Sequence, residues 1–224
     1  MVVLLAVYTS ANAQSWSLTG NAGTNANTNF IGTMDSKPLV FRINNERAGF
    51  VNGTNTSMGK LTLVSNTTGV DNVAIGAFST RYNTTGSGNA ALGKAALSSN
   101  TTGGENVAMG WDALRSNTIG ACNTAIGTRA MANKSPESWS LGIAVGYEAL
   151  QGSSVASRNT GTSNTALGFQ ALKENTTGSA SVGVGTKALR LITSGSGLCA
   201  MGSAALFSNT TGSYNTGSEH LRWK

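Results

Sequence analysis

NAALGKAAL at residues 89–97 and NVAMGWDAL at residues 106–114 are two copies of one nine-residue phrase. Nine copies of this phrase occur along the chain, and each is centred on a glycine. Successive central glycines are 17 residues apart, except for one step of 19 and one of 22. They are Gly59, Gly76, Gly93, Gly110, Gly127, Gly146, Gly168, Gly185 and Gly202. Self-similarity at a fixed short period indicates a repeat architecture.

Equivalent positions of the copies form columns with distinct requirements. Two residues before the central glycine, seven of the nine copies carry a core alanine, namely Ala74, Ala91, Ala108, Ala125, Ala144, Ala166 and Ala200. The residue between this alanine and the glycine is always aliphatic or methionine, as in Leu92 and Met109. Neighbouring residues of a strand point to opposite sides. We therefore expect a strand buried on both sides, with the alanines against a tight interior and the larger side chains against a larger surface.

The residues after the central glycine alternate between polar and apolar. The second one is polar or charged in most copies, for example in Asp112, Glu148 and Lys187, which predicts an outward-facing position. The Ala-Leu pair that follows, as in Ala96 and Leu97, is expected to return to the core. The glycine itself permits a close backbone approach or a positive φ at a corner.

A second motif, SNTTG or a variant of it, recurs between the phrases and predicts a turn. It occurs at Asn66, Asn83, Asn100, Asn117, Asn175 and Asn209. Asn and Gly tolerate left-handed backbone conformations, and Asn and Thr side chains can bond locally to the main chain. A coil of 17 residues therefore comprises a strand, a corner and this turn.

So short a repeat cannot bury its apolar residues alone, so the coils must stack at about 4.8 Å. The sequence predicts an all-β parallel solenoid over residues 55–212, roughly 40 Å long on that spacing. Cys122 and Cys199 lie in different columns about four coils apart, or roughly 19 Å of rise. That exceeds the ~7 Å Cα limit for a disulfide, so the two cysteines are expected to stay unpaired.

The two ends differ from the repeat. Residues 1–13 read as a signal peptide, with an apolar run and an Ala-Asn-Ala cleavage signature, which predicts export. Residues 14–54 are expected to form an N-terminal β cap, with a strand over 38–43 and with Trp16, Phe30 and Phe50 covering the first coil. Residues 213–224 are expected to be a degenerate C-terminal tail. No run is long enough for a membrane-spanning helix.

Composition and motifs argue against catalysis. The chain has 15 Lys and Arg residues and a net charge of +6, but these residues are scattered, so no nucleic-acid partner is expected. His220, the only histidine, lies in the degenerate tail, and the carboxylates occur singly. We therefore expect no enzyme activity, no catalytic or metal-binding residues and no cofactor.

The repeated N-x-A-I-G-x-x-A-L phrase with its SNTTG turns resembles the head repeats of trimeric autotransporter adhesins, the YadA-like β-roll. It is similar to the longer-period form in secreted Bacteroidetes proteins and in phage tail-fibre-like proteins. The resemblance implies a left-handed roll, a parallel homotrimer that buries one apolar face, and an extracellular or outer-membrane-associated location. The function that it implies is structural or adhesive, with a host-cell, matrix or glycan surface as partner.

Other interpretations remain open. The insertions at residues 133–140 and 152–159 could carry a recognition surface, because loops that project from a solenoid often bind. Trp111, Tyr147 and Phe169 form an incomplete aromatic stripe, which is more typical of packing than of sugar stacking. Ice binding, or receptor binding by a tail-fibre-like rod, is the main alternative function.

Overall fold

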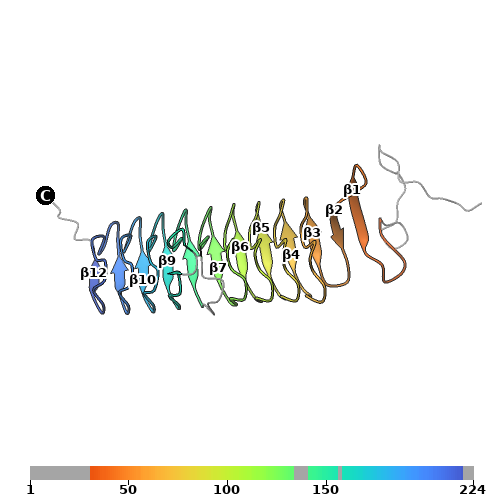
Figure 1. Cartoon of the computed structure of the whole chain (residues 1–224). Coiled ribbons are helices and arrows are strands. Elements are labelled where there is room, and N and C mark those ends of the chain that lie inside the picture. The colour runs from red at the N-terminus through yellow and green to blue at the C-terminus, as the bar shows by residue number, and fades with distance from the viewer. Residues whose placement is uncertain (1–30, 134–140, 156–157, 219–224) are drawn as a thin grey trace, which may run out of the picture. The chain divides into compact units, whose positions relative to one another are not determined.

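The computed structural model describes residues 31–133, 141–155 and 158–218. The expected signal peptide, Trp16, Phe30, most of the first insertion and His220 lie outside these residues. The chain divides into two compact units, Met1–Lys37 and Pro38–Lys224. In the second unit twelve strands form one sheet in chain order (Figure 1). They are β1 (Leu39–Ile43), β2 (Glu46–Val51), β3 (Thr56–Met58), β4 (Val73–Ile75), β5 (Ala90–Leu92), β6 (Val107–Met109), β7 (Thr124–Ile126), β8 (Ile143–Val145), β9 (Thr165–Leu167), β10 (Val182–Val184), β11 (Cys199–Met201) and β12 (Thr216–Ser218).

The ten strands from β3 to β12 are parallel, and each pairs in register with the strand of the next coil. Ala91 of β5 pairs with Ala108 of β6, so the alanines form a column along the solenoid. Neither insertion shifts this register, because Ala144 pairs with Ala125 on one side and with Ala166 on the other. The predicted all-β parallel solenoid is confirmed. The parallel pairing also continues into β12, within the segment expected to be degenerate.

The interior is one narrow core built from three columns. The strand alanines and the later Ala-Leu pair are almost fully buried, as Ala108, Ala113 and Leu114 at 0 % exposure illustrate. The expected return of the Ala-Leu pair to the core is confirmed. Met131 takes the leucine position in one coil and is also buried. Because each coil adds only three small or medium side chains to the core, each coil depends on its neighbours for burial.

The central glycines form a corner at which consecutive coils come into close contact. Gly110 has a φ of 131°, and a Cβ atom there would lie 2.6 Å from the carbonyl carbon of Gly127. A methyl group does not fit at that distance. Both reasons given for the glycine, close approach and positive φ, therefore apply.

Left-handed residues occur at positions that the sequence did not single out. Leu97 and Leu114, both fully buried, have φ values of 53° and 50°. A branched residue in this conformation costs about 1–2 kcal/mol, and burial of a leucine side chain returns about 1.5–3 kcal/mol. The asparagine and glycine of the SNTTG turn do not use the left-handed conformation that both residue types tolerate.

Buried asparagines form hydrogen bonds with main-chain N–H and carbonyl groups of the next coil. The side-chain oxygen of Asn89 accepts a hydrogen bond from the backbone N–H of Asn106 at 3.1 Å, and its Nδ2 donates to the carbonyl of Gly103 at 2.9 Å. That carbonyl also accepts from the turn asparagine Asn100 at 2.8 Å, as the local bonding expected of the turn requires. Unpaired polar groups would be costly in so narrow a core.

An antiparallel hairpin precedes the first coil. Strand β1 pairs with β2, and β2 pairs antiparallel with β3. β1 confirms the strand expected near residues 38–43. Phe50 of β2 is buried and forms a small cluster with Leu63 and Ala74. Cys122 and Cys199 are free thiols, as predicted.

Candidate functional site

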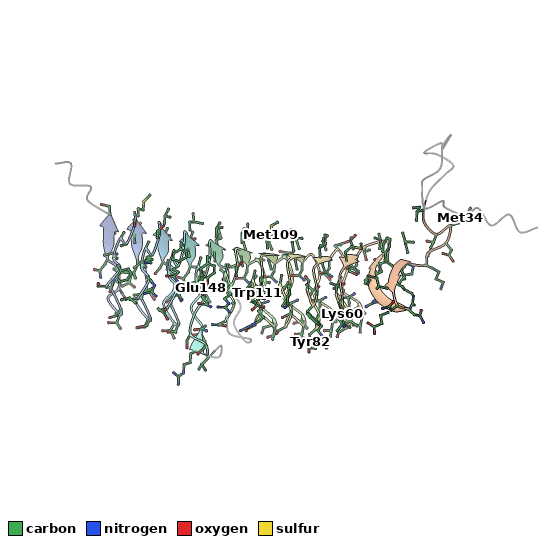
Figure 2. The ribbon with its side chains drawn as sticks, turned by 90° about the horizontal axis from the view of Figure 1, so that it is seen from above. Met34, Lys60, Tyr82, Met109, Trp111 and Glu148 are labelled. Carbon is green, nitrogen blue, oxygen red and sulfur yellow. The ribbon has the colours of Figure 1, made fainter. Side chains whose placement is uncertain are left out.

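One side of the parallel sheet is an exposed apolar surface. In each three-residue strand the middle residue points into the core, and the first and third point outward. We call the outward residues of β3–β12 the strand face. Its two columns are Thr56, Val73, Ala90, Val107, Thr124, Ile143, Thr165, Val182, Cys199 and Thr216, and Met58, Ile75, Leu92, Met109, Ile126, Val145, Leu167, Val184, Met201 and Ser218. Figure 2 places Met109 on the opposite side of the solenoid from Tyr82.

The strand face has no charged residue along its length and is exposed to solvent in the single chain. Leu92 and Val73 are each 44 % exposed, and Met201 is 58 % exposed. The expectation that both sides of the strand are buried therefore holds within one chain only for the alanine side. Ten strands of three residues give a plan area of about 430 Å². The largest apolar patch on a typical monomer covers about 300–600 Å² of accessible surface.

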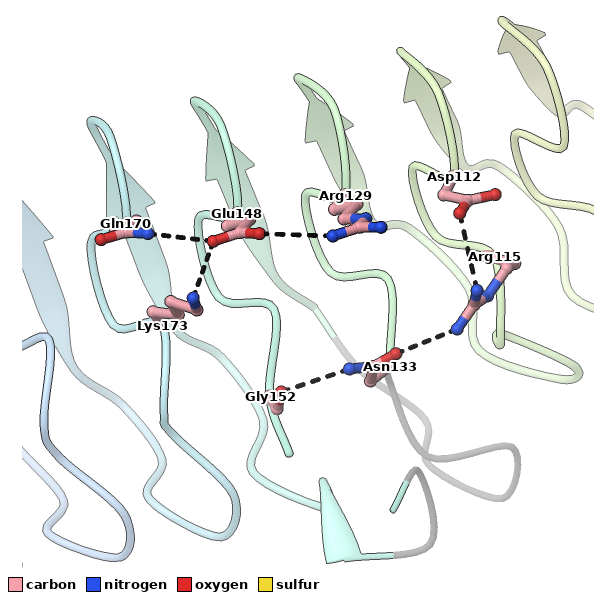
Figure 3. Close-up of polar contacts among 8 residues, drawn as sticks. All are labelled: Asp112, Arg115, Arg129, Asn133, Glu148, Gly152, Gln170 and Lys173. Atoms are coloured by element: carbon pink, nitrogen blue, oxygen red, sulfur yellow. Dashed lines mark hydrogen bonds and ion pairs between the residues drawn. The ribbon is translucent and has the colours of Figure 1, made fainter. Parts of the chain in front are cut away.

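A polar network crosses the surface of the solenoid near the two insertions (Figure 3). Glu148, at 6 % exposure, forms ion pairs with Lys173 at 2.7 Å and with Arg129 at 3.6 Å. Gln170 donates a hydrogen bond to Glu148 at 3.0 Å and accepts one from Arg190 at 3.1 Å. Burial raises the pKa of Glu148, but the hydrogen bonds from Lys173 and Gln170 bring it below its ordinary value. The network thus connects four coils across the two long steps of the repeat.

A second group of contacts ties the bases of the insertions together. Arg115 pairs with Asp112 at 3.5 Å and donates to the side-chain oxygen of Asn133 at 3.2 Å. Asn133 donates in turn to the carbonyl of Gly152 at 3.3 Å, and Asn159 donates to the carbonyl of Asn133 at 2.5 Å. The expectation that Asp112 and Glu148 face outward was wrong, because both are buried within these networks. Neighbouring side chains cover them: Arg115 pairs with Asp112, and Arg129, Lys173 and Gln170 contact Glu148.

The rings of the aromatic stripe pack against one another and against an arginine. Tyr147 and Phe169 stack at 5.5 Å between ring centroids, with their planes 11° apart. The guanidinium of Arg129 lies over the ring of Trp111 at 5.4 Å. Because these contacts occupy ring faces that a sugar would need, the stripe is better explained by packing along the solenoid.

The first threonine of the SNTTG turn forms a coil-to-coil hydrogen bond through its hydroxyl. The hydroxyl of Thr84 donates to the carbonyl of Thr101 at 3.0 Å, and Thr176 donates to Thr193 at 2.8 Å in the same way. These hydroxyls serve the stacking of the coils. The second threonines of the turns, such as Thr85 and Thr102, are exposed, and ice binding stays the alternative prediction.

Among the described residues, no three His, Cys, Asp or Glu side chains gather as a metal site would require. The described part of the chain has no helix long and apolar enough to cross a membrane. No family model, no curated protein and no solved structure matches the chain. The structural evidence on function therefore comes from the molecule's own surfaces, among them the strand face.

Proposed function

We propose that this protein is a non-catalytic structural or adhesive component of the cell surface or extracellular space, whose copies associate through the strand face. The observation that carries the proposal is a predominantly apolar strip along ten strands, which contains threonine and serine but no charged residue. Water contact on such a strip is unfavourable by about 25 cal/mol for each Å² of apolar surface. Association removes that cost.

A second copy of the same chain is the occupant that fits this surface best. Its own strand face is flat, apolar and built on the same coil spacing of about 4.8 Å, so side chains can interdigitate at each coil. The plan area of about 430 Å² understates the accessible area, because the side chains stand up from the sheet. Stable interfaces bury about 800 Å² on each partner. A parallel trimer, which the resemblance implies, would let each strand face contact two others.

Assembly would produce a rod that displays the polar side and the insertions to the surroundings. Such a rod acts by what it presents, as an adhesive or a spacer, and its partners would be cell, matrix or glycan surfaces. Export through the expected signal peptide accords with this role.

The test is the solution mass of the mature chain by light scattering. We expect wild type to have about three times the chain mass, and Leu92→Asp/Ile126→Asp to be a folded monomer. Thr186→Asp adds a carboxylate at an exposed position outside the strand face and should leave the assembly intact. A monomeric wild type at micromolar concentration would remove the assembly from the proposal. Surfaces coated with the assembled protein then test adhesion, with the monomeric variant as reference.

A further inference from the structure

A hollow of about 640 Å³ lies beside the N-terminal hairpin, next to the first coil. Its apolar lining includes Phe41, Ile43 and Met58. Ile43 is 69 % exposed, and Phe41 and Met58 are also exposed. The volume falls within the range of about 300–1,000 Å³ that is usual for small-molecule sites. Of these three residues only Met58 belongs to the strand face, and Phe41 and Ile43 belong to the hairpin.

The rest of the lining is predominantly basic. Arg42, Arg47 and Lys60 contribute three cationic side chains, and Glu46 is the one carboxylate among the lining residues. The ion pairs of the described residues lie elsewhere, within residues 112–173. The hollow is therefore a site of positive potential with an apolar floor.

The positions of Arg42 and Arg47 are unfavourable for the stability of the hairpin itself. Arg42 and Arg47 are directly opposite each other across the two strands, and a register shift between Phe41 and Arg42 marks a bulge at this point. Like charges opposite each other destabilise a strand pair. Bulges are common next to binding sites, where they redirect side chains.

Local contacts hold both guanidinium groups and leave donors for a ligand. Nη1 of Arg42 donates to the carbonyl of Asn45 at 2.8 Å, and the Arg47 guanidinium lies over the ring of Phe50 at 5.0 Å. A guanidinium has five N–H donors, so each retains several. Two arginines fixed side by side are well suited to bind one carboxylate, sulfate or phosphate.

We propose that this hollow binds an amphipathic anion, a molecule that joins an apolar chain or ring to a carboxylate, sulfate or phosphate head. The arginine pair and Lys60 bind the head, and Phe41, Ile43 and Met58 cover the apolar part. The bound anion also relieves the repulsion between the two arginines. The hollow shares Met58, in the first coil, with the strand face; its arginine pair lies in the hairpin, outside the strand face, and the proposal does not rest on adhesion.

Isothermal titration of the full chain with decanoate, below its micellar concentration, tests the proposal. We expect saturable one-to-one binding that weakens as salt is added. Decanol, which lacks the charge-assisted hydrogen bonds, and inorganic phosphate, which lacks the apolar chain, should each bind at least about tenfold more weakly. Cosedimentation with vesicles of anionic phospholipid shows whether the hollow also binds the head and tail of a membrane lipid. If it does, the variants below should lose both cosedimentation and decanoate binding.

Three variants assign the binding to the hollow. Arg42→Gln should weaken decanoate binding about tenfold, without loss of thermal stability because it removes a repulsion. Lys60→Gln should weaken binding, whereas Lys94→Gln, at the equivalent exposed position two coils along, should not. Absence of decanoate binding to wild type, equal binding of decanol, or unchanged binding by Arg42→Gln would overturn the proposal.

Discussion

Substitution of one central glycine, Gly110→Ala, probes the contact on which coil stacking depends. The added Cβ would lie 2.6 Å from both the carbonyl carbon and the carbonyl oxygen of Gly127. This neighbour is backbone, and its N–H is already bonded to the carbonyl of Met109 at 2.7 Å. It cannot move away without disturbing the next coil.

Two penalties apply to Gly110→Ala. The φ of 131° is a conformation that residues with a side chain rarely adopt, and such strain costs about 1–3 kcal/mol. Overpacking adds about 1–3 kcal/mol. We expect a loss of roughly 4 kcal/mol in the free energy of unfolding. Urea unfolding followed by circular dichroism, at one fixed protein concentration, measures it.

Two other glycines serve as controls. Gly53→Ala places its Cβ in open space and should be neutral. Gly88 has a φ of 68°, but its nearest neighbour atom is at 3.6 Å, and the same column holds Asp71 and Glu105 in a similar conformation. Gly88→Ala should therefore change stability by no more than about 1 kcal/mol. If Gly110→Ala unfolds at the same urea concentration as Gly53→Ala, the tight glycine corner is refuted.

Three further predictions concern the polar network, the asparagine ladder and the core. The pKa of Glu148 is lowered, so its contribution to folding stability is present above the ordinary carboxyl pKa and is lost as pH falls through the lower folded-state value. Glu148→Gln should lose about 1–3 kcal/mol of stability at pH 7, and its urea midpoint should fall less than that of wild type as the solution is acidified. Identical pH profiles of the two proteins would count against the network. Asn89→Ala leaves the buried backbone N–H of Asn106 without its acceptor, whereas the carbonyl of Gly103 keeps its bond from Asn100; the change should cost about 1–3 kcal/mol, seen as a lower melting temperature, and an unchanged melting temperature would refute the ladder. Ala125→Leu overfills the core and should cost about 1–3 kcal/mol in urea unfolding, whereas Ala90→Leu, on the strand face, should be tolerated; equal stabilities would contradict the assigned orientations.

The sequence predicted the solenoid well because each column reports one constraint many times. The alanine column predicted the tight interior, and the glycine column predicted the close corner, since a larger residue would clash in either place. A single copy would have been ambiguous between a strand and a helical turn. Repetition also placed Cys122 and Cys199 too far apart to pair.

The left-handed leucines and the buried carboxylates could not be predicted in the same way. Leucine is chosen in that column for its volume, and nothing in the residue type reveals a φ near 50°. Glu148 looks like a surface residue until Lys173, 25 positions later, is brought beside it across an insertion. The basic hollow depends on the cross-strand register of the hairpin, which a bulge sets and which the sequence pattern did not disclose.

The two native cysteines allow the strand face to be tested directly as the contact between copies. Cys199 belongs to the strand face, and Cys122 is exposed in the turn before β7. A spin label is attached to Cys199 in the Cys122→Ser chain, and to Cys122 in the Cys199→Ser chain. Apposed sheets lie about 10 Å apart, so we expect strong dipolar broadening of the electron paramagnetic resonance spectrum at Cys199 and little at Cys122. Equally sharp lines from both labels at assembly concentrations would contradict the account.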